Sequence, residues 1–348
     1  MNARRPISRR DLCASLAASI GAMHLGGCSR QNKAPHVADL SAKPFTGSTF
    51  AFDTYCTFTV YGDESAPAKL AQACTRYDGL YNLYDSASDI ARINRAGGEP
   101  VRVDPDTLDL LERSLSFCES SGGLFDITIG AVSTLWDFTE GKRPSEQEVA
   151  EALPHVNWRS IEIDTGNKTV RLCDPQASID LGGIAKGYVA DRLCNLLEQE
   201  TNATGAALSL GGNIAFFGKK PDGGPWEAGI RDPNDPGGAS VAGTVRIAGG
   251  SLVTSGLYER TFEADGITYW HILDPRTGFP VATDIVSDTV YCPSSTIADA
   301  LSTTLFVAGS QQGAAIADAH EATGALFLLQ HDKTAESSRW QELTDFSA

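Results

Sequence analysis

Two stretches of the chain pair short strands across a tight turn, and this pairing limits the fold more than any other feature. Residues 161–163 and 169–172 flank the turn DTGNK, and residues 206–218 read AALSLGGNIAFFG, in which two glycines interrupt a run of strand-forming residues. Short strands joined in this way pair as antiparallel hairpins. Helical segments are interspersed with them but do not form a regular strand–helix–strand alternation. We therefore predict an α+β fold of mixed, largely antiparallel sheets with flanking helices.

The other periodic segments fit one domain. Apolar residues recur at three- and four-residue steps over residues 66–84 and 104–121, which predicts helices. β-Branched and aromatic residues over 50–61 predict one continuous strand. Because no long linker interrupts residues 46–340, they are predicted to form a single domain. Towards the end of the chain the same patterns predict strands at 285–292 and 324–329 and helices at 296–308 and 311–321.

The first residues have the pattern of an export signal. Four arginines stand within the first ten residues, and a mostly apolar segment follows over 12–25. SRRDL resembles a twin-arginine signal, and LGGC resembles a bacterial lipobox that ends at Cys28. We predict a signal peptide over 1–27, a lipidated Cys28, a tether over 28–45, and a protein anchored to the bacterial cell membrane outside the cytoplasm. An uncleaved, disordered basic tail is the alternative.

Charge and cysteine spacing exclude two classes of function. The chain has a formal net charge of −16, whereas a sequence-independent nucleic-acid binder needs a basic surface. No nucleic-acid partner is therefore expected. An anionic ligand would need local positive groups or a metal ion to offset the repulsion. The cysteines lack CxxC spacing, which argues against a zinc site.

The stretch IDLGGIAKG joins an apolar strand to a helix through a glycine turn. Asp180 follows the strand, Gly182 and Gly183 allow a tight turn, and Lys186 lies in the first turn of the predicted helix. A helix N-terminus presents free N–H groups and a positive dipole, so this stretch is a candidate phosphate cradle. It matches neither the P-loop nor the dinucleotide-binding pattern. A tight turn with a solvated lysine is the alternative.

The stretch ADALSTTLF places a carboxylate and a hydroxyl on one face of a predicted helix. Asp299 and Thr303 are four residues apart. Oxygen ligands of this kind suit Mg²⁺. The alternative is an aspartate near the helix start and a buried threonine that bonds to its own turn.

Three further stretches have candidate site residues. HILDPRTGFP contains His271, which could act as a general base near neutral pH, although a single histidine is more often structural. LSLGGN could press backbone against a flat ligand. GGLFDITIG contains Asp126 in an apolar setting.

Taken together, these stretches are similar to the ApbE-type FAD:protein FMN transferases, over roughly residues 46–330. The resemblance implies that the protein uses FAD as substrate and Mg²⁺ as cofactor. It also implies cleavage of the FAD pyrophosphate, transfer of FMN to a Thr or Ser hydroxyl of an acceptor flavoprotein, and release of AMP. The motifs of the resemblance are SGGLFDITIG, IDLGGIAKGYVAD, LSLGGN, TSGLYER, HILDPRTGFPV and ADALSTTLF.

The resemblance also implies roles for individual residues. The Gly183 carbonyl, Asp299 and Thr303 would be the protein ligands of Mg²⁺, and His271 and Asp299 would be the catalytic residues. The start of the domain departs from the family pattern, because FDTYC stands where many members read MGT. The residues implied to contact FAD are Phe52, Tyr84, Leu124, Phe125, Asp126, Asp180, Lys186, His271 and Ile272.

Two other functions use the same motifs. A Mg²⁺-dependent FAD pyrophosphatase would hydrolyse FAD to FMN and AMP with the same residues. A flavin-binding lipoprotein would hold FAD without chemistry, but Asp299, Thr303 and His271 are all present. The acceptor is expected to carry a motif like Asp-x-x-Ser/Thr-Gly-Ala-Thr. The chain's own TNATGAAL matches that motif only in part and is interpreted as the lead-in to a strand.

Overall fold

The structure is a computed structural model that describes residues 43–348 except residues 236 and 238. The predicted signal peptide, the lipidated Cys28 and most of the tether lie outside the described residues. Within the described part, no helix is long and apolar enough to cross a membrane.

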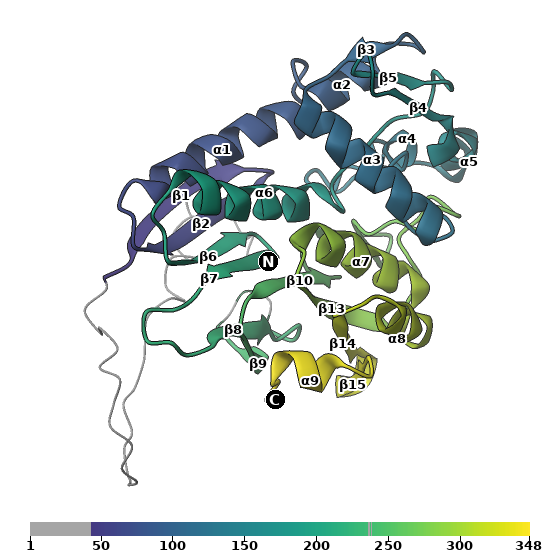
Figure 1. The fold of residues 1–348 in the computed structure, drawn as a ribbon. Helices are drawn as coiled ribbons and strands as arrows, with labels where there is room; N and C mark the ends of the chain where they lie inside the picture. Colours follow the sequence, from purple (N-terminus) through teal and green to yellow (C-terminus); the bar gives the residue numbers. More distant parts are fainter. Residues whose placement is uncertain (1–42, 236, 238) are drawn as a thin grey trace, which may run out of the picture.

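A single eight-stranded sheet forms the centre of the molecule (Figure 1). Its strand order is β1-β2-β6-β7-β10-β13-β14-β15, and every neighbouring pair is antiparallel. The prediction of an α+β fold with largely antiparallel sheets is confirmed. The strands are β1 (Phe45–Ala51), β2 (Thr54–Tyr61), β6 (Gly205–Leu210), β7 (Asn213–Gly218), β10 (Gly250–Gly256), β13 (Ile285–Cys292), β14 (Gly324–Leu329) and β15 (Lys333–Glu336).

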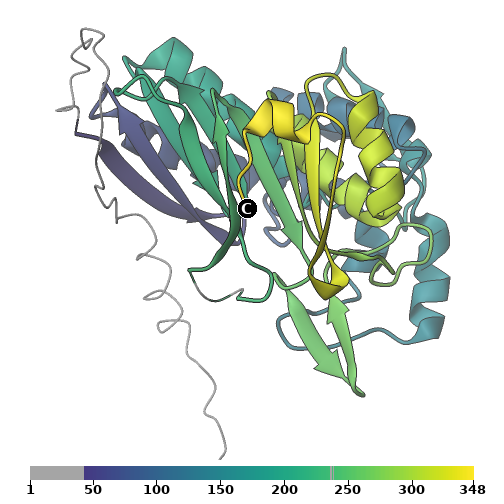
Figure 2. The ribbon, with the colours of Figure 1, turned by 90° about the horizontal axis from the view of Figure 1, so that it is seen from below.

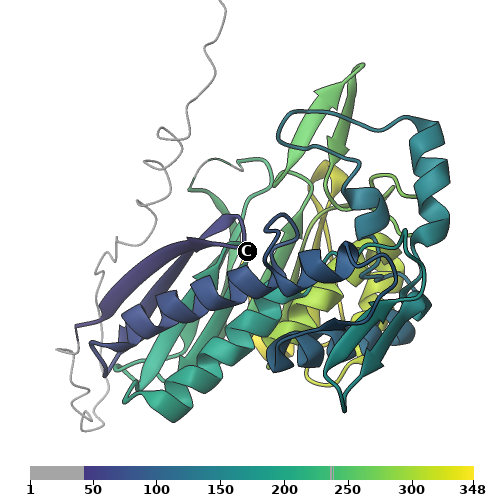
Figure 3. The ribbon, with the colours of Figure 1, turned by 90° about the horizontal axis from the view of Figure 1, so that it is seen from above.

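Long helices cover one face of this sheet. Figure 3 shows α1 (Ala66–Tyr81) and α6 (Ala185–Glu200) side by side across the strands β1, β2 and β6. The helices α7 (Ser295–Ala308) and α8 (Ser310–Ala319) cover the half of the sheet that contains β13 and β14. Apolar side chains between these helices and the sheet form the two largest buried clusters. The core therefore lies between the sheet and the layer that contains the glycine turn and α7.

The other face of the sheet is covered by a smaller layer, which Figure 2 shows from below. It consists of the hairpin β8 (Trp226–Arg231) and β9 (Val241–Ile247) and of α9 (Trp340–Thr344). Trp226 and Trp340 pack there against Phe216 of the central sheet and its neighbours. After α9, Ser347 forms a bridge with Thr244, so ordered structure continues past the predicted domain end at residue 340.

Two smaller units flank the helical layer. One is the sheet β3-β5-β4 with the neighbouring helices, and the other is the hairpin β11–β12, which projects from the body in Figures 2 and 3. Their bounds are β3 (Val101–Arg102), β4 (Ile161–Asp164), β5 (Thr169–Leu172), α2 (Asp89–Asn94), α3 (Pro105–Ser120), α4 (Gly130–Ser133), α5 (Glu146–Ala152), β11 (Thr261–Ala264) and β12 (Ile267–Trp270).

The prediction of one continuous strand over residues 50–61 is wrong. The chain reverses at Phe52 and Asp53, so this stretch contains the end of β1 and all of β2. Both turn residues have positive φ, 54° and 58°, as a two-residue hairpin turn requires. The usual Asn-Gly or Asp-Gly signal is absent, and an aromatic residue takes the first position instead. Left-handed backbone is unfavourable for such a residue, and strain of this kind is concentrated at functional sites.

Candidate functional site

The glycine turn joins Ile179 to α6, and Asp180 holds its shape. The prediction of a strand before Asp180 is wrong, because Ser178 forms only an isolated bridge with Ile129. One oxygen of the Asp180 carboxylate accepts a hydrogen bond from the Gly182 N–H at 2.9 Å. The other accepts one from the Ser133 hydroxyl at 2.7 Å. The carboxylate therefore fixes the turn against α4 through both of its oxygens. The Lys186 ammonium donates to the Gly182 carbonyl at 3.0 Å, so its charge lies at the turn.

Helix α7 packs directly against this turn. A methyl group built on Gly183 would lie 3.0 Å from Thr303 Oγ1 and 3.1 Å from a ring carbon of Phe125. The Gly187 N–H donates a hydrogen bond to Asp299 Oδ2 at 2.8 Å. The structure thus places Thr303 against Gly183, and Asp299, one helical turn earlier on α7, against Gly187.

Two oxygens at this contact have no protein partner. In the part of the chain that the structure describes, neither Thr303 Oγ1 nor Asp299 Oδ1 takes part in a hydrogen bond. The neighbouring Thr304 does bond to its own turn, donating to the Ala300 carbonyl at 2.7 Å. The alternative in which Thr303 only bonds to its own turn is therefore wrong. Neither oxygen is among the fully enclosed polar atoms without a partner, so both are accessible to water or to a ligand.

The oxygens of Asp299, Thr303 and Gly183 are of the kinds that bind Mg²⁺. Asp299 is 3% exposed, and burial raises the pKa of its carboxyl, an effect that the nearby Lys186 charge opposes. A bound cation would offset the same burial and favour the carboxylate. Carboxylate, hydroxyl and carbonyl oxygens are the ligands that Mg²⁺ takes. The described residues contain no cluster of three or more His, Cys, Asp or Glu side chains, so the site would depend on one carboxylate and neutral oxygens.

His271 directly follows β12, and the charges of Arg260 and Lys186 act on it. Desolvation lowers the pKa of its imidazole to about 4, and the charges of Arg260 and Lys186 act in the same direction. Its Nδ1 is enclosed and has no partner among the described residues. The ring of Phe138 lies edge-on, with ring centroids 6.5 Å apart. The imidazole is therefore neutral at pH 7 and able to accept a proton.

Arg260 connects this histidine to the β1–β2 turn. The Arg260 backbone carbonyl accepts a hydrogen bond from the backbone N–H of His271 at 3.2 Å. The Arg260 guanidinium forms an ion pair with Asp53 at 3.1 Å. The Phe52 N–H donates to Asp78 Oδ1 of α1 at 2.8 Å, which holds the turn on its other side. An exposed ion pair of this kind adds little stability, so its main effect is on the position of the turn.

The remaining predicted flavin contacts differ in how they are placed. Phe125 and Ile272 are buried in the core, so they can support the site but expose little surface to a ligand. Leu124 is partly buried against the α7 cluster. Asp126 is buried and its carboxylate accepts hydrogen bonds from Thr128 and the Trp158 N–H, so it is used internally. Tyr84 is 84% exposed, so its ring is open to a ligand.

Sequence reasoning missed Gly187, Asp191 and Arg260. Each stands inside a quoted motif, IDLGGIAKGYVAD or TSGLYER, but without an assigned role. Helical spacing offered one signal, because Gly187 and Asp191 are four residues apart and share a face of α6. No local pattern could have paired Arg260 with Asp53, since more than 200 residues separate them.

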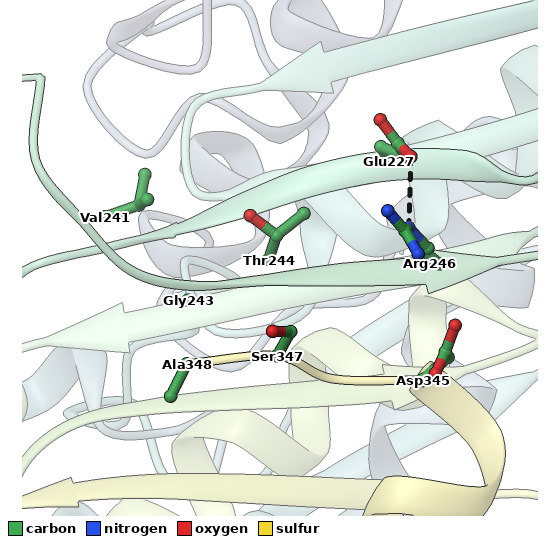
Figure 4. Close-up of a pocket in the computed structure, with 8 residues that line it drawn as sticks. All are labelled: Glu227, Val241, Gly243, Thr244, Arg246, Asp345, Ser347 and Ala348. Atoms are coloured by element: carbon green, nitrogen blue, oxygen red, sulfur yellow. Dashed lines mark hydrogen bonds and ion pairs between the residues drawn. The ribbon is translucent and has the colours of Figure 1, made fainter. Parts of the chain in front are cut away.

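A pocket of about 470 Å³ lies elsewhere and contains none of the predicted site residues (Figure 4). It is formed by the β8–β9 hairpin and the end of the chain, and an ion pair between Arg246 and Glu227 at 3.1 Å crosses its wall. It has no unpaired buried donor and no histidine or cysteine. The geometry around Asp299 and His271 is therefore the better candidate.

Comparisons with known proteins identify the family of the chain. The model of the ApbE family matches residues 52–327. A Treponema pallidum protein named FAD:protein FMN transferase is 39% identical, over 85% of this chain and 87% of its own length. A Haemophilus influenzae protein of the same name is 29% identical over 97% of this chain and 99% of its own.

Solved structures give the same result. The crystal structure of the ApbE protein from Thermotoga maritima superposes with a TM-score of 0.80 at 32% identity, covering 86% of this chain and 99% of that one. The flavin transferase ApbE from Vibrio cholerae superposes with a TM-score of 0.76 at 25% identity, covering 87% and 99%.

Proposed function

The chain belongs to the ApbE family and is a flavin transferase, and from this premise we propose that it transfers FMN from FAD to a Thr or Ser hydroxyl of an acceptor flavoprotein in a Mg²⁺-dependent reaction that releases AMP. The observation that carries the proposal is the pair of unpartnered oxygens, Asp299 Oδ1 and Thr303 Oγ1, beside Gly183. Magnesium bound there would stabilise the charge that develops on the pyrophosphate.

The chain's own residues account for the rest of the reaction. The acceptor hydroxyl forms a bond to the FMN phosphorus, and the bond from that phosphorus to the bridging oxygen breaks. The hydroxyl proton passes to neutral His271, whose lowered pKa keeps it in the basic form at pH 7. Lys186 would hold the phosphates, because it places a positive charge at the glycine turn. The N–H groups of Ala185 and Gly187 at the start of α6 already have protein acceptors, so the expected cradle of free N–H groups is largely used within the protein.

The flavin would lie between the β1–β2 turn and the turn at Asp180. Tyr84 is the exposed aromatic residue there, and Phe52 is partly buried against the core, with Phe125 and Ile272 buried beneath the site. Stacking on such rings suits an isoalloxazine or adenine ring. The strained φ of Phe52, held by Asp78, supports a role for this turn in the site, because strained backbone is concentrated at functional sites.

The location of the protein is part of the proposal. SRRDL and LGGC support export and lipidation of Cys28, which would tether the domain to the bacterial membrane outside the cytoplasm. The acceptor would then be an exported or membrane-associated flavoprotein with a motif like Asp-x-x-Ser/Thr-Gly-Ala-Thr.

The test combines the full-length protein with FAD, Mg²⁺ and a protein that carries the acceptor motif. Intact mass spectrometry measures FMN addition, and chromatography measures AMP. We expect an adduct and AMP with the wild type and neither with Asp299→Asn. FMN and AMP without an adduct would instead indicate a pyrophosphatase. FAD that is bound but stays intact would indicate a binding protein without chemistry.

A further inference from the structure

The helices α6 and α7 approach each other closely at Gly187. A methyl group built on Gly187 would lie 2.3 Å from the Ser295 carbonyl oxygen and 2.6 Å from the Asp299 β-carbon. Only a residue without a β-carbon fits between the two backbones at this distance. The position of Asp299 therefore depends on how α7 is seated on α6.

Asp191 holds the start of α7 from the neighbouring helix. Its Oδ1 accepts the Ser295 N–H at 2.8 Å. Its Oδ2 accepts the Thr296 N–H at 2.9 Å, the Thr296 hydroxyl at 2.6 Å and the Ser294 hydroxyl at 2.8 Å. The first N–H groups of a helix have no partner within it, so a carboxylate there binds strongly and also complements the helix dipole.

The two helices exchange carboxylates. Asp191 of α6 binds backbone N–H groups of α7, and Asp299 of α7 binds the Gly187 N–H of α6 at 2.8 Å. The anchor points are four residues apart on each helix, Gly187 and Asp191 on one, Ser295 and Asp299 on the other. Two contacts one turn apart fix both the rotation and the translation of α7.

We propose that Asp191 is a positioning residue for the metal site, acting through α7 to aim Asp299 Oδ1 and Thr303 Oγ1 at Gly183. The inference rests on the proposed metal role of Asp299 and Thr303. It gives Asp191 a function in the reaction, although Asp191 need not touch FAD, the metal or the acceptor.

Other contacts hold the start of α7 as well, and they limit the expected effect. The Ser295 hydroxyl donates to Asn213 Oδ1 at 2.9 Å, and the Ser251 hydroxyl donates to the Ser295 oxygen at 2.9 Å. Removing the Asp191 carboxylate therefore leaves α7 attached to the sheet but free to shift against α6. Groups that orient metal ligands from behind typically contribute about 10- to 100-fold to metal affinity.

The control is a carboxylate that caps a helix without a site residue. Asp284 accepts hydrogen bonds from the Ser310 N–H at 3.0 Å and from the Ser310 hydroxyl, and so caps α8. Asp284→Ala should lower stability to a similar extent as Asp191→Ala. A difference in metal binding between the two variants then results from a changed position of Asp299 and Thr303 and not from a general loss of stability.

The experiment measures Mn²⁺ binding to the full-length protein by electron paramagnetic resonance, alongside thermal unfolding and the dependence of FMN transfer on Mg²⁺. For Asp191→Ala we expect roughly 10- to 100-fold weaker Mn²⁺ binding, and activity that partly recovers at high Mg²⁺. Asp191→Asn keeps one acceptor oxygen and should fall between Asp191→Ala and the wild type. Asp284→Ala should bind Mn²⁺ as the wild type does.

Two results would overturn the inference. The first leaves the proposed metal role of Asp299 intact, and the second removes it as well. If Asp191→Ala binds Mn²⁺ within about twofold of the wild type while its melting temperature falls as in Asp284→Ala, Asp191 is a structural cap only and the metal role of Asp299 stands. If the wild type itself binds no Mn²⁺, both the metal part of the proposed function and the inference fail.

Discussion

Replacing Gly187 by alanine tests the close contact between α6 and α7. The added β-carbon would lie 2.3 Å from the Ser295 carbonyl oxygen, whereas a carbon and an oxygen in contact stay about 3.3 Å apart. The helices must therefore separate by roughly 1 Å, because the opposing atoms are backbone and cannot rotate away. The Gly187 N–H would move away from Asp299 Oδ2 by a similar distance.

The size of the effect follows from this displacement. Overpacking of this kind costs about 1–3 kcal/mol, partly offset by the roughly 1 kcal/mol by which alanine favours a helix over glycine. The melting temperature should fall by about 2–4 °C for each kcal/mol lost. A 1 Å misplacement at a reaction centre costs about 100-fold in rate. We therefore expect a protein that is folded at 25 °C but whose FMN transfer is about 100-fold slower.

The assay follows FMN addition to the acceptor by intact mass, together with thermal unfolding by circular dichroism. Gly79→Ala in α1 is the matched control, because a β-carbon there meets nothing within 4 Å. It should keep full activity and gain about 0.5–1 kcal/mol of stability. Wild-type activity and stability in Gly187→Ala would refute the reasoning, because the contact could then relax without moving Asp299.

Three other outcomes are expected. Asp299→Asn should lower FMN transfer by at least about 1000-fold with little loss of melting temperature, because it removes a charge placed to stabilise the reaction centre. On the acid side, kcat/KM should fall with a midpoint at about pH 4, not near the pKa of 6.5 of free histidine. The reason is that His271 acts as a base only when its imidazole is neutral, and its pKa is lowered to about 4. Burial raises the pKa of Asp288 above its usual value, so its folded form binds the proton more tightly than its unfolded form. The contribution of Asp288 to stability should then fall as pH rises above about 4, so Asp288→Asn should be more stable than the wild type by about 1–3 kcal/mol at pH 8 but not at pH 4, as measured by urea unfolding at both pH values.

The sequence predicted those elements whose local pattern matches their final environment. The hairpins β4–β5 and β6–β7 form where glycine-containing turns separate the strands. The helix around Asp299 and Thr303 forms as α7, and its period places the two side chains one turn apart. The β1–β2 turn was missed because Phe52 and Asp53 adopt positive φ without the residues that usually do so. There the tertiary contacts with Asp78 and Arg260 override the local preference.

The sequence indicated which residues could belong to the site, but not which residues they contact in the structure. Asp299, Thr303, Lys186 and His271 could be chosen because their chemistry suits a metal and a phosphate. The four-residue spacing from Asp299 selects Thr303 over Thr304, but it does not tell that Thr304 bonds to its own turn while Thr303 does not. The Asp191 clamp joins residues more than 100 positions apart, so no spacing rule applies to it.

The hydrogen bonds of four aspartates separate supporting roles from functional ones. Asp180 and Asp191, which are half-buried, accept protein hydrogen bonds at both oxygens, so both carboxylates fix backbone. Asp288 and Asp299 each keep one oxygen without a partner among the described residues. They differ in their surroundings, because Lys186 acts on the pKa of Asp299 while no cation acts on that of Asp288. Burial raises the pKa of both groups, but the Lys186 charge opposes the rise at Asp299 and a bound cation would oppose it further. Asp299 is therefore suited to a cation, and Asp288 to remaining protonated within the core.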